Sequence, residues 1–102
     1  MTANEFLQEA AATLAQRGAQ YDPATSSERS AERAAAIFNE AFLVVEGTAL
    51  LARDVWLVLL SVKLARLRTV VDPTDTLIDI INYFALLGEE LTKQPYNTPP
   101  AV

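Results

Sequence analysis

Helix-breaking residues are scarce in the body of this chain of 102 residues. It contains 3 Gly and 5 Pro, and three of the Pro lie between Pro95 and Pro100. Glycine and proline interrupt helices and strands most strongly, so long unbroken segments remain between them. Within those segments apolar residues recur at intervals of three and four positions, which is typical of helices with one apolar face. The pattern predicts an all-α fold.

The helix-breaking and helix-capping residues divide the chain into four expected helices, which form a bundle-like domain over residues 1–92. A flexible, Pro-rich tail is expected over 93–102. Since no other stretch has the composition of a linker, we expect a single domain. The helices are expected at about residues 2–17, 28–45, 48–69 and 73–92.

Several helix ends carry residues with a physical reason to lie there. Thr2 and Glu5 have the spacing of a capping box, in which each side chain bonds the other residue's backbone N–H. Asp72, followed directly by proline, is typical of a helix start. Gly18 and Gly47 are the expected stops of the first two helices.

The third expected helix is apolar almost all round, from Leu50 to Leu67. A helix of that kind is normally buried within its domain or its oligomer. Of all residues 51% are hydrophobic and only 21% are charged, which is rich for a chain of 11.1 kDa that must keep a wet surface. We therefore expect a homo-oligomer, a dimer or higher.

Composition excludes several classes of chemistry. The chain has no Cys and no His, which removes disulfide frameworks, zinc sites built on those residues and histidine-based triads. A bound metal would have to be held by oxygen ligands, which favours Mg²⁺, Mn²⁺ or Ca²⁺. The net charge of −5 argues against a broad DNA- or RNA-binding surface.

The sequence shows neither the pattern of a secretory signal peptide nor that of a membrane-spanning helix. The N-terminus lacks a basic region followed by an apolar run, and charges interrupt every apolar stretch before it reaches 18 residues. We expect no membrane association and a cytoplasmic location.

A polar stripe runs along the last expected helix. Asp75, Asp79 and Asn82 lie within about 60° of one another at helical spacing, among apolar neighbours. In an antiparallel hairpin with the preceding helix, Arg66 falls opposite Asp75 and Lys63 falls opposite Asp79. Two interpretations stay open: an ionic ladder that fixes the register, or the charged floor of a nucleotide pocket, where carboxylates hold Mg²⁺ and basic residues meet phosphate.

A second pair of carboxylates, Glu28 and Glu32, lies at i, i+4 spacing on the second expected helix. The pair reads either as a solvated face with local partners in Arg29 and Arg33, or as the other half of a metal site.

The segment from Arg17 to Tyr21 reads either as a helix end with a turn, or as a loop that brings a guanidinium and an aromatic ring to a ligand.

The chain resembles a family of small, mostly uncharacterised proteins common in bacteriophages and prophages, over about residues 7–92. That family is itself similar to the MazG-like, all-α nucleoside triphosphate pyrophosphohydrolases. The resemblance rests on the motifs Arg17-Gly18-x-x-Tyr21, Ile37-Phe38-Asn39, Lys63-Leu64-Ala65-Arg66 and Asp75-x-x-x-Asp79.

The resemblance implies an oligomeric helical bundle in which acidic residues on two helices bind Mg²⁺ or Mn²⁺ against a triphosphate. Water then releases pyrophosphate and a nucleoside monophosphate. Asp79 aligns with the acidic residue that closes the second motif, Glu-x-x-Asp, whereas Thr76 stands at the Glu position of that motif. Glu28-x-x-x-Glu32 is the nearest substitute for the first motif, Glu-x-x-Glu.

Three functions therefore remain in view. The first is binding of a nucleotide with Mg²⁺, with hydrolysis as its extension, in a host cytoplasm. The second is a non-catalytic module that sequesters a nucleotide or occupies another protein, and the third is a structural helical oligomer. Candidate site residues are Asp75, Asp79, Glu28 and Glu32 for metal, Lys63, Arg66 and Arg17 for phosphate, and Tyr21 and Asn82 for the pocket wall.

Overall fold

The computed structural model describes residues 1–22, 29–45 and 47–93, and within them the chain forms helices and no strand. The prediction of an all-α fold with four helices is therefore confirmed. Their bounds are α1 Ala3–Tyr21, α2 Ser30–Ala41, α3 Ala52–Arg66 and α4 Thr74–Lys93.

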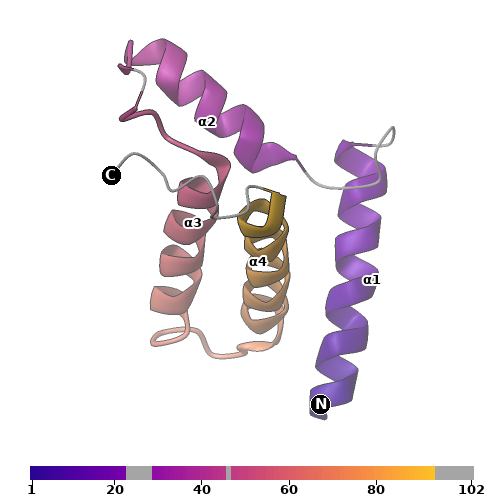
Figure 1. Ribbon diagram of the computed structural model, residues 1–102. Helices are drawn as coiled ribbons and strands as arrows, with labels where there is room; N and C mark the ends of the chain where they lie inside the picture. The colour runs from indigo at the N-terminus through magenta and orange to yellow at the C-terminus, as the bar shows by residue number, and fades with distance from the viewer. Residues whose placement is uncertain (23–28, 46, 94–102) are drawn as a thin grey trace.

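Three of the helices lie side by side, with α4 in the middle (Figure 1). The helices α3 and α4 form an antiparallel hairpin, while α1 packs on the other side of α4 and runs in the same direction as α4. The helix α2 packs against α3 and crosses obliquely beyond the end of the other three, so that its C-terminal end stands away from them. The central position of α4 makes it the helix on which side chains from α1 and α3 converge.

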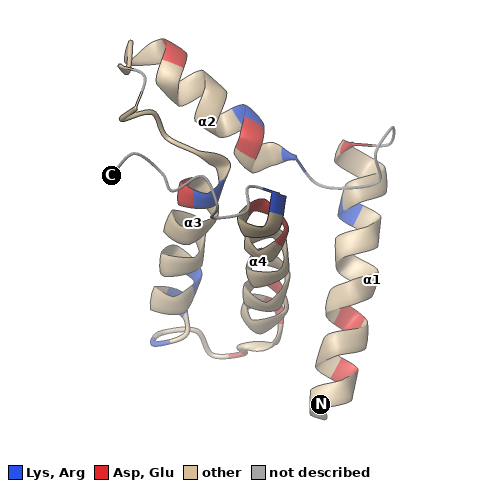
Figure 2. Ribbon diagram, in the orientation of Figure 1, with Lys and Arg blue, Asp and Glu red and all other residues tan. Residues whose placement is uncertain are grey.

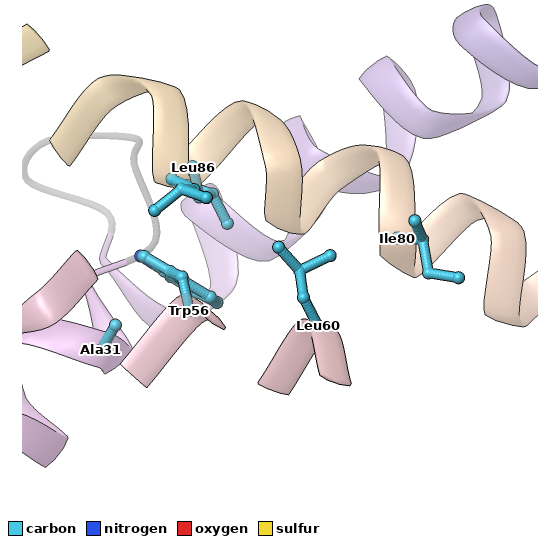
Figure 3. Packing of buried hydrophobic residues seen from close by; sticks show 6 residues of the cluster. Ala31, Trp56, Leu60, Ile80 and Leu86 are labelled. Atoms are coloured by element: carbon cyan, nitrogen blue, oxygen red, sulfur yellow. The ribbon is translucent and has the colours of Figure 1, made fainter. Parts of the chain in front are cut away.

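The hydrophobic core lies mainly between α3 and α4. Trp56 and Leu60 of α3 point toward Leu86 and Ile80 of α4, and Ala31 of α2 packs beside Trp56 (Figure 3). Burying one such large side chain contributes about 1.5–3 kcal/mol. These contacts hold the hairpin together and leave the opposite side of α3 outside the core.

The first helix ends at Tyr21, four residues beyond the expected end at Arg17. Gly18 is buried inside α1, and the helix continues to Tyr21. Asp22 precedes a proline in the sequence, which disfavours helical backbone, and its N–H bonds to the Gly18 carbonyl at 2.9 Å. The stop is therefore this pair and not the glycine. At the other end of α1 the expected capping box of Thr2 and Glu5 is present.

The second helix ends at Ala41 and not at Val45. Leu43 adopts a left-handed backbone conformation with φ 49°, and the N–H of Val44 bonds the carbonyl of Asn39 at 3.0 Å. This arrangement is the Schellman motif that closes many helices, with leucine where glycine is usual. The expected start at residue 28 lies outside the described residues.

The third helix begins at Ala52 rather than at residue 48. The Asn39 side chain accepts the N–H of Leu50 and donates to its carbonyl, both at 2.8 Å, which holds this part of the connection extended. Asp54 then accepts the N–H of Leu51 at 2.8 Å at the helix start. The helix stops at Arg66, three residues short of the expected end.

The fourth helix begins at Thr74, one residue after the expected position. The Asp72 carboxylate accepts both the Thr74 hydroxyl, at 2.7 Å, and its N–H, at 3.1 Å. These hydrogen bonds, that from the hydroxyl being the stronger, lower the pKa of Asp72 from its ordinary value. The expected flexible tail falls on residues 94–102, outside the described residues.

No helix of the described part of the chain is long and apolar enough to span a membrane.

Candidate functional site

The side chain of Asp79 joins three helices. Its Oδ1 accepts from the Arg17 guanidinium of α1 at 3.0 Å, and its Oδ2 lies 2.7 Å from Nζ of Lys63 on α3. The side chain of Asp79 is 13% exposed, that of Lys63 is 17% exposed and that of Arg17 is 32% exposed. The carboxylate is thus largely withdrawn from water, with a cation on each oxygen. We call these three residues the Asp79 cluster.

The register of the α3–α4 hairpin explains half of the cluster. The two helices are antiparallel and joined by a short connection, so the residue numbers of two facing residues add up to nearly the same value along the hairpin. The pairing of Lys63 with Asp79, expected on this basis, is confirmed. The expected pairing of Arg66 with Asp75 is wrong: no ion pair joins them, and both residues are exposed. Arg66 lies about 60° further round α3 than Lys63, which turns it away from α4.

The other half of the cluster, Arg17, was expected at a phosphate and not on Asp79. A signal was present in the sequence, because Arg17 continues the buried stripe of Ala10 and Leu14 at helical spacing. A cation on the buried face of one helix needs an anion on the face it packs against. In this fold that face belongs to α4.

Asn82 lies one turn beyond Asp79 on the same stripe of α4. It is only 3% exposed, and its amide nitrogen Nδ2 has no hydrogen-bond partner. An unpaired buried donor of this kind costs about 1–3 kcal/mol. Most buried polar groups in proteins are paired, so this one marks a position where an acceptor atom fits.

The remaining residues expected near the pocket are distributed differently. Tyr21 is exposed at the end of α1. Next to it, the buried Asp22 accepts the guanidinium of Arg33 and, at 2.9 Å, the N–H of Arg29. The hydrogen bond from Arg33, followed by that from Arg29, lowers the pKa of Asp22. Asp22 therefore ties the end of α1 to the start of α2.

Glu32 is engaged on α2 by its neighbour. Arg29 donates to it at 2.6 Å, and this hydrogen bond lowers the pKa of Glu32. Glu28 lies outside the described residues. Within the part of the chain that is described, no three acidic side chains come together to hold a metal ion. The described carboxylates, Glu32 on α2 and Asp75 and Asp79 on α4, therefore do not come together in one chain as a resident metal site.

Mg²⁺ that is bound to a nucleotide needs fewer protein ligands than a resident metal ion, and α4 carries residues that could serve. Mg²⁺ that arrives with a nucleotide is usually held by one or two carboxylates together with phosphate oxygens. Asp75 and Asp79 are one turn apart, and Asp75 is exposed. Oxygen-only donors of this kind suit Mg²⁺ or Mn²⁺.

The distribution of charge around these residues is uneven. Figure 2 shows that charges are sparse along the middle of α3 and concentrated near its ends. The chain as a whole carries −5, whereas the Asp79 cluster combines two positive groups with one negative group. The cluster thus brings two basic side chains to one carboxylate on an acidic protein.

Comparison with known proteins places the chain in a family. Residues 5–91 match DUF6378, a domain of unknown function. The chain belongs to the DUF6378 family. The match includes all four helices except the first two residues of α1 and the last two of α4. Each residue of the Asp79 cluster therefore lies within the DUF6378 domain. No curated protein and no solved structure matches the chain.

Proposed function

We propose that this DUF6378 protein binds the phosphate groups of a nucleotide, carried with Mg²⁺, at the Asp79 cluster. The observation that carries the proposal is the convergence of Arg17 and Lys63, from two different helices, on one largely buried carboxylate. An isolated ion pair would need only one cation. The shared carboxylate holds a guanidinium and an ammonium group close together, and phosphate oxygens accept charge-assisted hydrogen bonds from both kinds of donor.

The cluster supplies the geometry that phosphate recognition needs. Asp79 holds Arg17 and Lys63 in fixed positions, which lowers the entropy lost when they meet a ligand. Arg17 is a third exposed, so a phosphate in solution can reach its planar donor fork. Arg66, which was expected at phosphate, is exposed and turned away from α4, so it is not part of the proposed phosphate site. Asn82 contributes a buried donor on the same stripe of α4.

Mg²⁺ belongs to this proposal as part of the ligand. Asp75 is the first carboxylate that a metal–phosphate complex would meet, and Asp79 becomes the second when Arg17 or Lys63 turns to phosphate. The kinship with MazG-like proteins and the phage origin implied by the sequence resemblance are part of the same proposal. The all-α fold and the acidic residues on the fourth helix support the kinship.

Hydrolysis to a monophosphate and pyrophosphate is an extension of this proposal that needs further acidic ligands for the metal; among the described residues Glu32 is paired with Arg29 on α2. Pyrophosphate release decides this point and is measured beside binding.

The proposal is tested by the melting temperature of the protein with ribo- and deoxyribonucleoside triphosphates, with and without Mg²⁺. A ligand that binds only the folded state raises the melting temperature. We expect a rise for the parent protein and none for Asp79→Asn, whose helical circular dichroism stays intact. Glu32→Gln, which removes a carboxylate on α2, is the matched control and keeps the rise. If no nucleotide shifts the parent protein, the cluster is a structural ionic ladder and the proposal fails.

A second candidate function is a non-catalytic interaction module that works as a homo-oligomer. It is favoured by large apolar side chains that the described part of one chain leaves exposed, chiefly on α2, on α3 and after α2. Examples with more than half of their surface exposed are Ile37, Phe42, Leu43, Val45 and Val58. Self-association and nucleotide binding are compatible, because the Asp79 cluster lies on the other side of α3 from Val58.

A further inference from the structure

The outward face of α3 is apolar and has nothing of the described chain packed on it. Val58 is 60% exposed and Val62 is 45% exposed, on the side opposite Trp56 and Leu60, which face the core. Two further exposed apolar side chains, Leu57 and Leu59, lie on either side of them. The combined exposed surface of these four side chains is on the order of 350 Å², within the range of the largest patch on a typical monomer.

Opposite charges stand at the two ends of this face. Asp54, Val58, Val62 and Arg66 follow one another at intervals of four residues, so they form one slightly slanted stripe along α3. No charged residue lies between Asp54 and Arg66 on the stripe, because Lys63, which lies between them in the sequence, is on the side of α3 that faces Asp79. The stripe is therefore negative at its start, apolar in its middle and positive at its end.

We propose that this face binds the same face of a second copy, with the two α3 helices antiparallel. A two-fold axis between Val58 and Val62 places each Val58 opposite Val62 of the other copy. The same axis places Asp54 opposite Arg66 of the other copy, twice. A parallel pair would instead put like charges together at both ends, which is unfavourable. The order of charge along α3 thus selects both the orientation and the register.

A second copy is the occupant that this pattern fits. An isologous interface requires a surface that is complementary to itself, and the stripe meets this condition in charge and in shape. The inference gives a surface to the self-association proposed above, and it is independent of nucleotide binding.

The first test is the molecular mass in solution, by light scattering on a sizing column. The parent chain has a mass of 11.1 kDa and is expected to elute with twice that mass. Val62→Glu buries two charges in the apolar middle and is expected to elute as a monomer with unchanged helical circular dichroism. Ala15→Glu, on the exposed side of α1, is the matched control and stays dimeric. A monomeric parent protein, or a Val62→Glu variant that stays dimeric, overturns the inference.

The second test reads the register directly and does not depend on the stability of a monomer. The chain contains no cysteine, so single cysteines can be introduced without background. When Val58→Cys and Val62→Cys chains are mixed and oxidised, we expect a disulfide-linked heterodimer to be the main cross-linked product. Ala15→Cys chains are expected to stay uncross-linked. Equal cross-linking of the control, or none between positions 58 and 62, contradicts the antiparallel register.

Discussion

Asn82 stands out among single residues because a buried amide donor without a partner lowers the stability of the free protein. Replacement by an apolar side chain of similar size removes that cost. We expect Asn82→Leu to raise the free energy of unfolding by about 1 kcal/mol in the absence of ligand. The same change is expected to weaken nucleotide binding, because the donor is lost. Urea unfolding and a binding titration on the same protein measure both effects.

The opposite pattern would show that Asn82 serves the fold. If Asn82→Leu is less stable than the parent protein and binds nucleotide equally well, the amide has no role in ligand recognition.

Leu43 carries strain of a different origin. Its φ of 49° is unfavourable for a residue with a branched side chain, and the side chain is 86% exposed, so packing offers little compensation. Leu43→Gly is expected to raise the free energy of unfolding by up to about 1 kcal/mol, since glycine adopts this conformation freely. Leu43→Ala keeps the strain and is the control in the same urea titration. Equal stabilities of the glycine and alanine variants would contradict this explanation.

Among the helices, the junction of α1 with α2 depends on one carboxylate. Asp22 accepts from Arg33 and from the N–H of Arg29, and these bonds hold the pKa of Asp22 below its ordinary value of 3.8. A lowered folded-state pKa contributes stability above pH 3.8, and that stability is lost as the pH falls through the folded-state pKa. The pKa values of Asp72 and Glu32 are also lowered, so their contributions to stability are likewise lost as the pH falls.

Asp22→Asn should therefore have a lower melting temperature than the parent protein at pH 7. The difference between the two proteins should narrow as the pH falls below 4, because the parent Asp22 becomes protonated. Melting followed by circular dichroism between pH 3 and 7 measures this. A difference that stays constant over the whole range would show that the Asp22 carboxylate makes no pH-dependent contribution.

The existence of the helices could be predicted from the sequence, but several of their ends could not. The scarcity of glycine and proline and the spacing of apolar residues predicted four helices, because those features act locally. The end of α2 and the start of α3 depend on Asn39, whose side chain bonds Leu50 eleven residues away. A contact over that distance depends on the path of the chain and leaves no periodic signal.

The candidate site shows the same division. The pairing of Lys63 with Asp79 followed from the register of one hairpin, in which two helices are joined by a short connection. Arg17 on Asp79 required knowing that α1 packs against α4, which nothing in the local pattern of α1 determines. Arg66 and Asp75 do not pair in the described chain because Arg66 lies about 60° round α3 from Lys63. Adding residue numbers predicts which positions are level with each other along the hairpin but not toward which side each side chain points.

For the molecule as a whole, the hydrophobic content exceeds what the described part of one chain buries. The third helix was expected to be buried because it is apolar almost all round, yet in a single chain only Trp56 and Leu60 on it are buried. The remaining apolar surface is the reason to expect a second copy. A protein that buries this face by self-association leaves the Asp79 cluster, on the other side of α3, accessible from solution.

Calorimetric titration of the parent protein with Mg²⁺ and the common nucleoside triphosphates tests whether the Asp79 cluster is a phosphate site. Lys63→Met removes a cation of the cluster, and Arg68→Met removes the same charge from an exposed position after α3. A hydrogen bond to a charged group contributes about 1.5–3 kcal/mol, so we expect Lys63→Met to weaken binding by about 10- to 100-fold. Arg68→Met should bind like the parent protein. If no nucleotide binds the parent protein, or if both variants bind equally well, the cluster is a structural link between three helices and the proposed function is wrong.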